Sequence, residues 1–462
     1  MYWAENLATK LVFIFFLFPK PLIFTFESFT HLMMSGNTFF AVFLIFHFIT
    51  FGKIHLLGSD TITYYQHIKP IIDEHCTGCH RTGQTAPFSL ESYEDLKKRA
   101  SMVEMVVESK YMPPWHADTL FRTFHNQRAL SASSLNKILA WIKSGAPAGL
   151  PQKKGAVNGF NWPSPDKIVA FQKPFIIPGD NEEQYRFFVI PVDNPAPIYL
   201  RGVGFVPKNK TLAHHSRIMI DTTKRIRPFD AASVWQAGPQ LEKMNIPLAN
   251  SFWTGWVPGN FPLFYPDGVA KVLPANADLV VNMHYAPSAK EETDQSEIHL
   301  YYAKGKPRRI IETLVFDETW VTNKPFEFQP DTVITFYMRS PVLPVDLSLL
   351  SVLPHMHLLG KSFKSFAITP DGDMIPLIHI PEWDFNWQQT YQFNNLLKIP
   401  RGSVIYAEAT FDNSKNNPKN PYFPPAKVRY GWGTKDEMMN LIFEYLLYEP
   451  GDEYLDFYAS EH

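Results

Sequence analysis

The segment ADLVVNMHYA, residues 277–286, indicates most directly which fold class this chain adopts. It is a short run rich in β-branched and aromatic residues, which is the pattern of a β-strand. Side chains two positions apart on a strand project to one face, so Asn282 and His284 are expected on the same face. Further runs of this kind are YRFFVIPV (185–192), APIYLRGVGFV (196–206), DTVITFYMR (331–339) and SVIYAEATF (403–411).

The composition of the whole chain agrees with this reading. The 462 residues include 39 prolines, with 15% aromatic and 19% charged residues, which favours short strands joined by proline-rich turns over a helical bundle. The length suggests about three domains at roughly 150 residues each. A net charge of −2 gives no reason to expect a nucleic-acid partner. The composition and the strand patterns therefore predict a mainly β chain. No nucleotide-binding glycine loop, serine nucleophile elbow or HExxH helix occurs in the sequence, so the candidate site residues must be sought in other motifs.

The first 57 residues differ from the rest of the chain. LVFIFFLF (11–18) is apolar but is followed by two prolines, and FFAVFLIFHFITF (39–51) has signal-peptide length and is too short to span a bilayer comfortably. Met33 and Met34 precede the second run, so one reading is a start at either methionine after an upstream extension. The other reading is a membrane tether of two weak segments. Both predict export to the periplasm or cell envelope of a bacterium.

Cys76 and Cys79 are the only cysteines, and His80 follows them directly in CTGCH. Cys-x-x-Cys-His is the attachment motif of c-type haem, in which the thiols bind the porphyrin and the histidine is the proximal iron ligand. A zinc knuckle would need two further ligands at short spacing, and a thioredoxin-like pair would lie between a strand and a helix. Neither context is present, so the sequence predicts covalent haem. No cysteine then remains for a disulfide.

Two helices are expected beside this motif. YEDLKKRASMVEMVVES (93–109) repeats apolar residues at three- and four-residue spacing. SASSLNKILAWIKSG (131–145) begins with serines suited to capping and ends at a glycine. Met102 and Met105 lie in the first helix, where we expect core positions.

The segment YMPPWHAD between these helices supplies the candidate distal iron ligand. Met112 precedes two prolines that hold the chain extended and away from helix. His116 is the weaker rival for the same role. A His/Met pair occupies both axial positions and therefore favours electron transfer over oxygen binding. Residues 58–150 are thus predicted to be a small all-α cytochrome c domain.

Five histidines in the remaining chain fall into three short contexts. LAHHSRIMI contains His214 and His215, VVNMHYAP contains His284, and LPHMHLLGK contains His355 and His357. On a strand, His355 and His357 face one side and can chelate one ion. The adjacent His214 and His215 can share a metal only at a strand end or a bulge. Imidazole suits copper and zinc alike, and the upstream haem motif favours the redox-active metal.

These segments, together with GTKDEMMNLIFEYLLY (433–448), resemble in their order and scale the copper type II, ascorbate-dependent monooxygenases, the family of peptidylglycine α-hydroxylating monooxygenase and dopamine β-monooxygenase. The resemblance covers roughly residues 165–450. It implies two antiparallel, jelly-roll-like β-sandwiches, each with one copper, on either side of a solvent-filled cleft. It further implies that one copper supplies electrons and that the other binds oxygen. The ligands it implies are His214, His215 and His284 for the first copper, and His355, His357 and Met438 for the second, catalytic copper.

The resemblance also implies an activity, which is hydroxylation of a substrate C–H bond with O₂ and two electrons. The haem would reload the copper ions in place of ascorbate or alongside it, with an external electron donor as a further partner. Peptide-hydroxylating members hold a substrate carboxylate with an arginine and a tyrosine, and those positions are Leu353 and Ile442 here. We therefore expect a small, less polar, non-peptide substrate. Asn440 matches the family pattern near the copper methionine, and Asn282 stands where the peptide enzymes have a glutamine.

The organisation that follows is a leader, a haem domain, a linker, two copper sandwiches and a tail, at 1–57, 58–150, 151–164, 165–305, 306–450 and 451–462. One alternative is a non-catalytic, copper-binding electron-transfer protein whose β region docks a partner. Another is a purely structural pair of sandwiches with incidental histidines.

Overall fold

The computed structural model describes residues 61–151, 163–244, 246, 252–260 and 262–455. The predicted leader lies outside these ranges, as do most of the predicted linker and of the predicted tail. Within the described ranges, no helix is both long and apolar enough to cross a membrane. Strands account for 36% and helices for 15% of the structure, which confirms the mainly β prediction.

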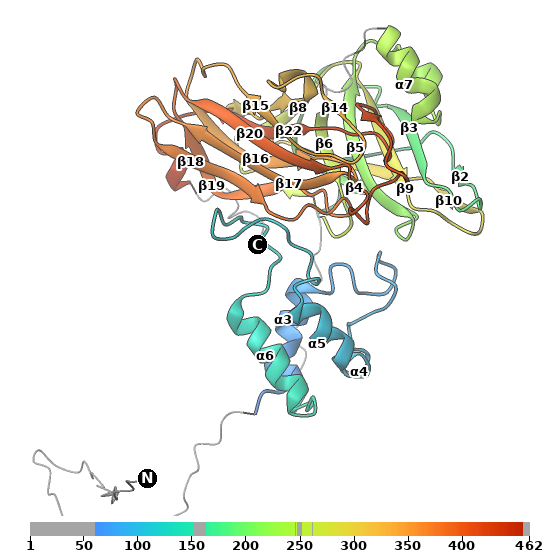
Figure 1. Ribbon diagram of the computed structural model, residues 1–462, viewed down its shortest axis with the longest axis vertical. Helices are drawn as coiled ribbons and strands as arrows, with labels where there is room; N and C mark the ends of the chain where they lie inside the picture. Colours follow the sequence, from blue (N-terminus) through green and yellow to red (C-terminus); the bar gives the residue numbers. More distant parts are fainter. Residues whose placement is uncertain (1–60, 152–162, 245, 247–251, 261, 456–462) are drawn as a thin grey trace, which may run out of the picture. The chain divides into compact units, whose positions relative to one another are not determined.

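Strands from the first half of the β region form two sheets around one core, and we call them the first sheet pair (Figure 1). One sheet has the antiparallel order β3 (Gln184–Pro191), β9 (Asp278–Tyr285), β5 (Ala213–Asp221) and β6 (Phe252–Trp256). The other has the order β1 (Lys167–Ala170), β11 (Glu297–Tyr302), β4 (Ile198–Val206), β8 (Val269–Leu273) and β12 (Arg309–Ile310), with β7 (Leu263–Phe264) beside β4. A short ribbon pairs β10 (Glu292–Asp294) with β2 (Phe175–Ile177).

Side chains alternate across β3 and β9, so the two faces of that sheet bury different partners. Phe188 and Val281 point into the core shared with the second sheet. Phe187 and Val280 point the other way and pack against the helix α7 (Val234–Lys243). The short 3-10 helix at Arg227–Phe229 precedes α7.

The second sheet pair is built from the later strands around a separate core. One antiparallel sheet has the order β13 (Glu312–Phe316), β22 (Asn440–Leu447), β16 (Leu347–His355) and β19 (Tyr391–Ile399). The other has the order β15 (Val333–Arg339), β20 (Val404–Asp412), β17 (Gly360–Ile368) and β18 (Met374–Ile380). The remaining elements are β14 (Glu327–Phe328), β21 (Val428–Arg429) and 3-10 helices at Glu318–Trp320 and Asp452–Tyr454.

A buried ion pair joins the two sheet pairs. Lys271 of β8 is 2% exposed, contacts the carboxylate of Glu444 on β22 and donates to the carbonyl of Trp253. Ser351 donates to the other carboxylate oxygen of Glu444 at 3.0 Å. Removing either charge would leave its partner buried and unpaired, which typically costs about 3–5 kcal/mol. The pair therefore helps to hold the two halves together.

The helices before the β region are π-helical Tyr64–Ile68, α3 (Lys69–His75), α4 (Tyr93–Lys98), α5 (Ala100–Glu108) and α6 (Ala132–Lys143). The second predicted helix is confirmed, because Ser131 caps α6 and Gly145 follows it with a positive φ of 87°.

The first predicted helix, 93–109, was wrong as a single element. It breaks at Arg99, whose φ and ψ of −111° and 12° are not helical. The core positions predicted for Met102 and Met105 were also wrong, since these side chains are 48% and 63% exposed. The buried stripe of α5 is instead formed by Val103 and Val107. The helical core thus uses one narrow face of α5.

Residues 115–126, between α5 and α6, pack against the second sheet pair. Ala117 and Phe124 are buried in its core, and Phe124 forms a β-bridge with Phe393. The backbone N–H groups of Asp118 and His125 donate to carbonyls of the second sheet pair, each at 2.8 Å. This segment fastens the helical region to the β region.

Candidate metal-binding cleft

His214, His215 and His284 come together in the first sheet pair. In the ladder of β5 and β9, His215 pairs with His284, and a register shift between Ala213 and His215 leaves His214 as the extra residue. A shared metal was expected to require a strand end or a bulge at these two residues, and the register shift provides such an irregularity. Because of it, both adjacent histidines approach His284, and one nitrogen from each of the three rings lies within 4.8 Å of the others.

Contacts on the outer side of these rings determine which nitrogens face inward. The Nε2 of His214 lies 3.3 Å from the Oδ1 of Asn386, and the Nε2 of His284 lies 3.4 Å from the carboxylate of Glu183. The amide oxygen of Asn386 accepts only from an N–H at Nε2, so the Nδ1 of His214 presents a lone pair. The contact between His284 and Glu183 has an ion-pair distance and is not a hydrogen bond.

The Nδ1 of His215 lies 3.0 Å from the Nδ1 of His214 and 3.5 Å from the Nδ1 of His284. One proton on His215 can satisfy only one of them, whereas a metal ion would satisfy all three nitrogens. Burial lowers the pKa of all three imidazoles, to about 4 for His214. They are therefore neutral at pH 7, which is the form that binds metals. This group of residues fits a divalent or monovalent transition metal.

Glu183 is expected to strengthen metal binding by orienting His284. Its carboxylate contacts His284 Nε2 and also accepts a hydrogen bond from Thr434 at 2.7 Å. Losing such an outer partner typically costs about 10- to 100-fold in metal affinity. Glu183→Gln should therefore weaken copper binding by about tenfold in a competition titration with a chelator. The exposed neighbour Glu182 provides the control, and equal affinity of both variants would contradict this role.

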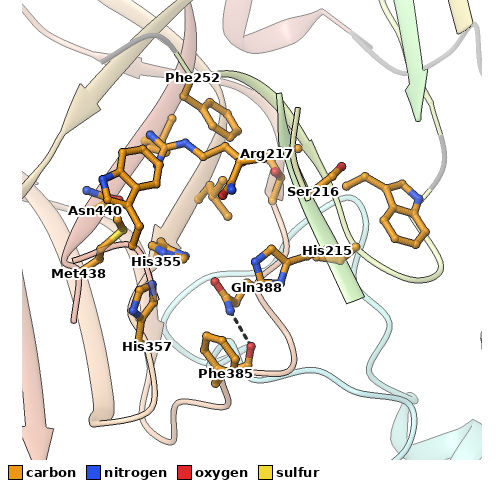
Figure 2. A pocket seen from close by; sticks show the side chains of 18 of the residues that line it. His215, Ser216, Arg217, Phe252, His355, His357, Phe385, Gln388, Met438 and Asn440 are labelled. Atoms are coloured by element: carbon orange, nitrogen blue, oxygen red, sulfur yellow. Dashed lines mark hydrogen bonds between the residues drawn. The ribbon is translucent and has the colours of Figure 1, made fainter. Parts of the chain in front are cut away.

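The second group lies at the end of β16, where His355 is the last strand residue and His357 follows two positions later. Their ring centroids are 5.1 Å apart. The Nδ1–H of His357 donates to the carbonyl of Asp436 at 3.0 Å, which leaves the Nε2 lone pair available. Burial lowers the pKa of His357 to about 4. Figure 2 shows Met438 beside these two imidazoles on the same wall of a cleft.

Glu437 holds this second group in place, and the sequence reasoning did not assign it a role. Its fully buried carboxyl accepts backbone N–H groups of His357 at 2.9 Å, Leu359 at 2.7 Å and Met438 at 3.2 Å. Burial raises the pKa of this carboxyl to about 8, and the three donors oppose that shift. One side chain therefore connects the His-x-His turn to the loop that carries Met438.

The cleft lies between the two sheet pairs and has a cavity volume of about 70 Å³. Residues of both groups line it, namely His215, His355, His357 and Met438, together with the predicted substrate residues Asn282 and Asn440. Leu353 and Ile442 also line it, so the two positions at which the sequence pattern predicted apolar side chains instead of a carboxylate clamp do face the cleft.

Arg217 also reaches into this cleft, from β5 on the opposite wall (Figure 2). Its guanidinium lies 5.8 Å from the ring centroid of Phe252 and 5.4 Å from that of Trp432. The cleft is therefore mostly apolar but contains one cation. The expectation of a less polar site rested on Leu353 and Ile442, which lie on the wall opposite Arg217.

Phe385 lies between the two histidine groups. Its ring centroid is 6.0 Å from that of His214, 6.2 Å from that of His215 and 5.9 Å from that of His357. Both groups thus face one aromatic ring on the loop between β18 and β19. No sequence signal pointed to Phe385.

Glu318 gives the cleft region a pH-dependent stability. Burial raises its pKa from 4.5 to about 7, with Asp317 adding to the shift and Arg217 opposing it. The folded state therefore holds this proton more tightly than the unfolded state, and the associated stability is lost as the pH rises from about 4.5 to about 7. Because Glu318 is partly exposed, we expect Glu318→Gln to gain about 1–2 kcal/mol relative to the unaltered chain between pH 5 and pH 8 in urea unfolding. The prediction would be wrong if the difference in free energy of unfolding between Glu318→Gln and the unaltered chain were the same at pH 5 and at pH 8.

The Cys-x-x-Cys-His motif follows α3, and its geometry fits haem. Cys76 and Cys79 are free thiols, and burial raises the pKa of both. The Nδ1–H of His80 donates to the carbonyl of Phe88 at 3.1 Å, so the Nε2 lone pair is available to iron. Met112 is half-buried just beyond α5, where its N–H donates to Val106 at 3.0 Å, and its role as distal ligand stays a prediction. His116 lies beside Glu382 of the β region.

The described residues thus define a mainly β protein with two histidine groups at one cleft and a Cys-x-x-Cys-His motif before them. No known protein family and no curated protein matches the sequence. Among solved structures, the major capsid protein P2 of bacteriophage PM2 is similar at 9% identity and a TM-score of 0.23, over 62% of this chain and 99% of that chain. The VP2 subviral particle of infectious bursal disease virus is similar at 10% identity and a TM-score of 0.18, over 62% and 73%. Similarity at these TM-scores carries no information on function.

Proposed function

We propose that this protein is an exported copper-dependent monooxygenase that hydroxylates a C–H bond of a small substrate and carries two copper ions and one covalent c-type haem. In this proposal the sheet pairs are the two sandwiches of a copper type II monooxygenase, and the helical region is a cytochrome c domain. The observation that carries it is the placement of His215 and of the His355, His357 and Met438 group on one cleft.

The proposed reaction consumes two electrons, which two copper ions and a haem bound to this chain would supply one at a time. Hydroxylation consumes the C–H substrate, one O₂, two electrons and two protons, and yields the alcohol and one water. Bound copper would supply the one-electron chemistry with O₂. Two separate ligand groups can hold two such ions, and a haem would accept single electrons from ascorbate or from an external donor.

The ligand types differ between the two groups in a way that suits this division. Three imidazoles bind both copper oxidation states, which supports electron supply. The thioether of Met438 is a soft ligand that favours Cu(I), the state that reacts with O₂. His355, His357 and Met438 would hold the second copper, which would supply the chemistry with O₂.

The walls of the cleft indicate the kind of substrate. Phe252, Leu353 and Ile442 present apolar surface, which suits a small hydrocarbon or aromatic body. Arg217 and Asn440 present polar groups from opposite walls and would orient one polar end of the substrate. We therefore propose a small, amphipathic, non-peptide substrate.

The test is a search for oxygenated products. Protein matured with haem outside the cytoplasm and loaded with copper is incubated with ascorbate, ¹⁸O₂ and a library of small amphipathic compounds, and mass spectrometry detects incorporated ¹⁸O. We expect products that Met438→Leu abolishes and Met356→Leu retains, because Met356 is buried in the core of the second sheet pair. Copper-loaded protein that shows haem reduction but no oxygen uptake and no product would instead support the electron-transfer alternative.

A further inference from the structure

We propose that the loop 257–260 is the electron path from the haem to the first histidine group, with Arg128 as the residue that positions it. This inference rests on the proposed function and adds a route, a direction and named residues to it. The loop follows β6 of the first sheet pair, and one of its sides contacts the Cys-x-x-Cys-His motif.

Gly259 makes the contact with the haem-attachment motif. A Cβ atom at this position would lie 2.7 Å from the Sγ of Cys79, so the glycine backbone itself is in van der Waals contact with the thiol. The residue also has a φ of +78°, which side chains other than glycine rarely adopt. Both features require glycine, and the contacted sulfur is the atom that would be bonded to the porphyrin.

Arg128 fixes the loop in this position from the helical side. Its Nη2 donates to the Oδ1 of Asn260 at 2.9 Å, and its Nη1 donates to the carbonyl of Pro258 at 3.5 Å. The two Nη groups of the guanidinium thus bind the residue before Gly259 and the residue after it. A second contact lies nearby, where Thr85 donates to the carbonyl of Lys210 at 3.0 Å, just before β5.

The other end of the loop leads to the first histidine group. Val257 and Asn260 line the same cleft as His215. Trp256 at the end of β6 is the cross-strand partner of Ser216, the residue next to His215 on β5. A path therefore runs from Cys79 to Gly259 through one contact and then along the backbone to Trp256. From there it crosses the β-ladder to Ser216 and reaches the adjacent His215.

The step along this path is a single electron transfer. Cys76, Cys79 and His80 would hold the haem and His214, His215 and His284 would hold the copper, so that one electron lost by ferrous haem would reduce Cu(II) to Cu(I) without a bond being made or broken and without proton transfer. A one-electron donor, either ascorbate or a small reduced c-type cytochrome, then returns the haem to the ferrous state.

The test measures electron transfer directly rather than product. Haem- and copper-loaded full-length protein is mixed anaerobically with a substoichiometric one-electron reductant, and haem absorbance is followed as the ferrous band decays onto Cu(II). Gly259→Ala and Asn260→Ala are expected to slow this decay several-fold at unchanged haem content, copper content and haem reduction potential. Asn394→Ala is the matched control, because it breaks a hydrogen bond from Asn394 to Thr123 that ties the helical region to the second sheet pair.

The outcomes are distinguishable. Decay at the unaltered rate in both loop variants, with haem and copper fully bound, would overturn the route and leave the proposed function intact. Equal slowing in Asn394→Ala would also overturn it, because general loosening of the helical region would then be the cause. An unaltered chain that binds haem but no copper would overturn the proposed function and the route together.

Discussion

Replacing Glu437 with leucine is expected to lower the free energy of unfolding by about 3–5 kcal/mol, because three buried backbone N–H groups lose their acceptor at once. Each orphaned donor costs about 1–3 kcal/mol, and relaxation reduces the total. The turn that carries His357 and the loop that carries Met438 would separate, so metal binding at the second group should be lost as well. Urea unfolding and metal analysis measure these two effects.

Glu437→Gln is the matched control for this prediction. The amide keeps one acceptor oxygen and the same shape, so we expect a smaller loss of about 1–2 kcal/mol. A leucine variant that stays within 1 kcal/mol of the unaltered chain and retains both metals would show that the carboxyl does not hold the site together.

The second large effect concerns the haem. The double variant Cys76→Ala/Cys79→Ala is expected to lose all covalently bound haem, since both porphyrin attachment points are removed. The haem absorption spectrum of the acid- and solvent-extracted protein measures this, because only covalent haem stays with the chain. His75→Ala changes a histidine adjacent to the motif and should keep one haem per chain. Retention of covalent haem in the double variant would contradict the assignment of the motif.

The sequence was sufficient for the features that depend on local patterns. The β class followed from short β-branched and aromatic runs. The adjacency of His214 and His215 indicated that a shared metal would require a strand end or a bulge. The end of α6 followed from Gly145. The break at Arg99 and the exposure of Met102 were not predictable in this way, because apolar periodicity does not reveal a one-residue interruption or the width of the buried face.

The features that the sequence did not reveal depend on contacts between distant segments. Asn386 and Glu183 fix the orientation of the histidine rings from positions 172 and 101 residues away from their partners. Arg217 reaches the cleft from the strand opposite Leu353. Residues 115–126 pack into a core whose other buried members are residues 316 and later. Such partners leave no periodic or spaced pattern in a single sequence.

Two copper centres and one haem are proposed to share this chain, and metal analysis combined with EPR spectroscopy distinguishes this proposal from its alternatives. For protein matured with haem outside the cytoplasm, we predict two copper ions and one haem per chain, with two type II Cu(II) signals. His215→Ala should alter one copper signal and Met438→Ala the other. Haem without stoichiometric copper, or copper binding that neither substitution changes, would contradict the claim.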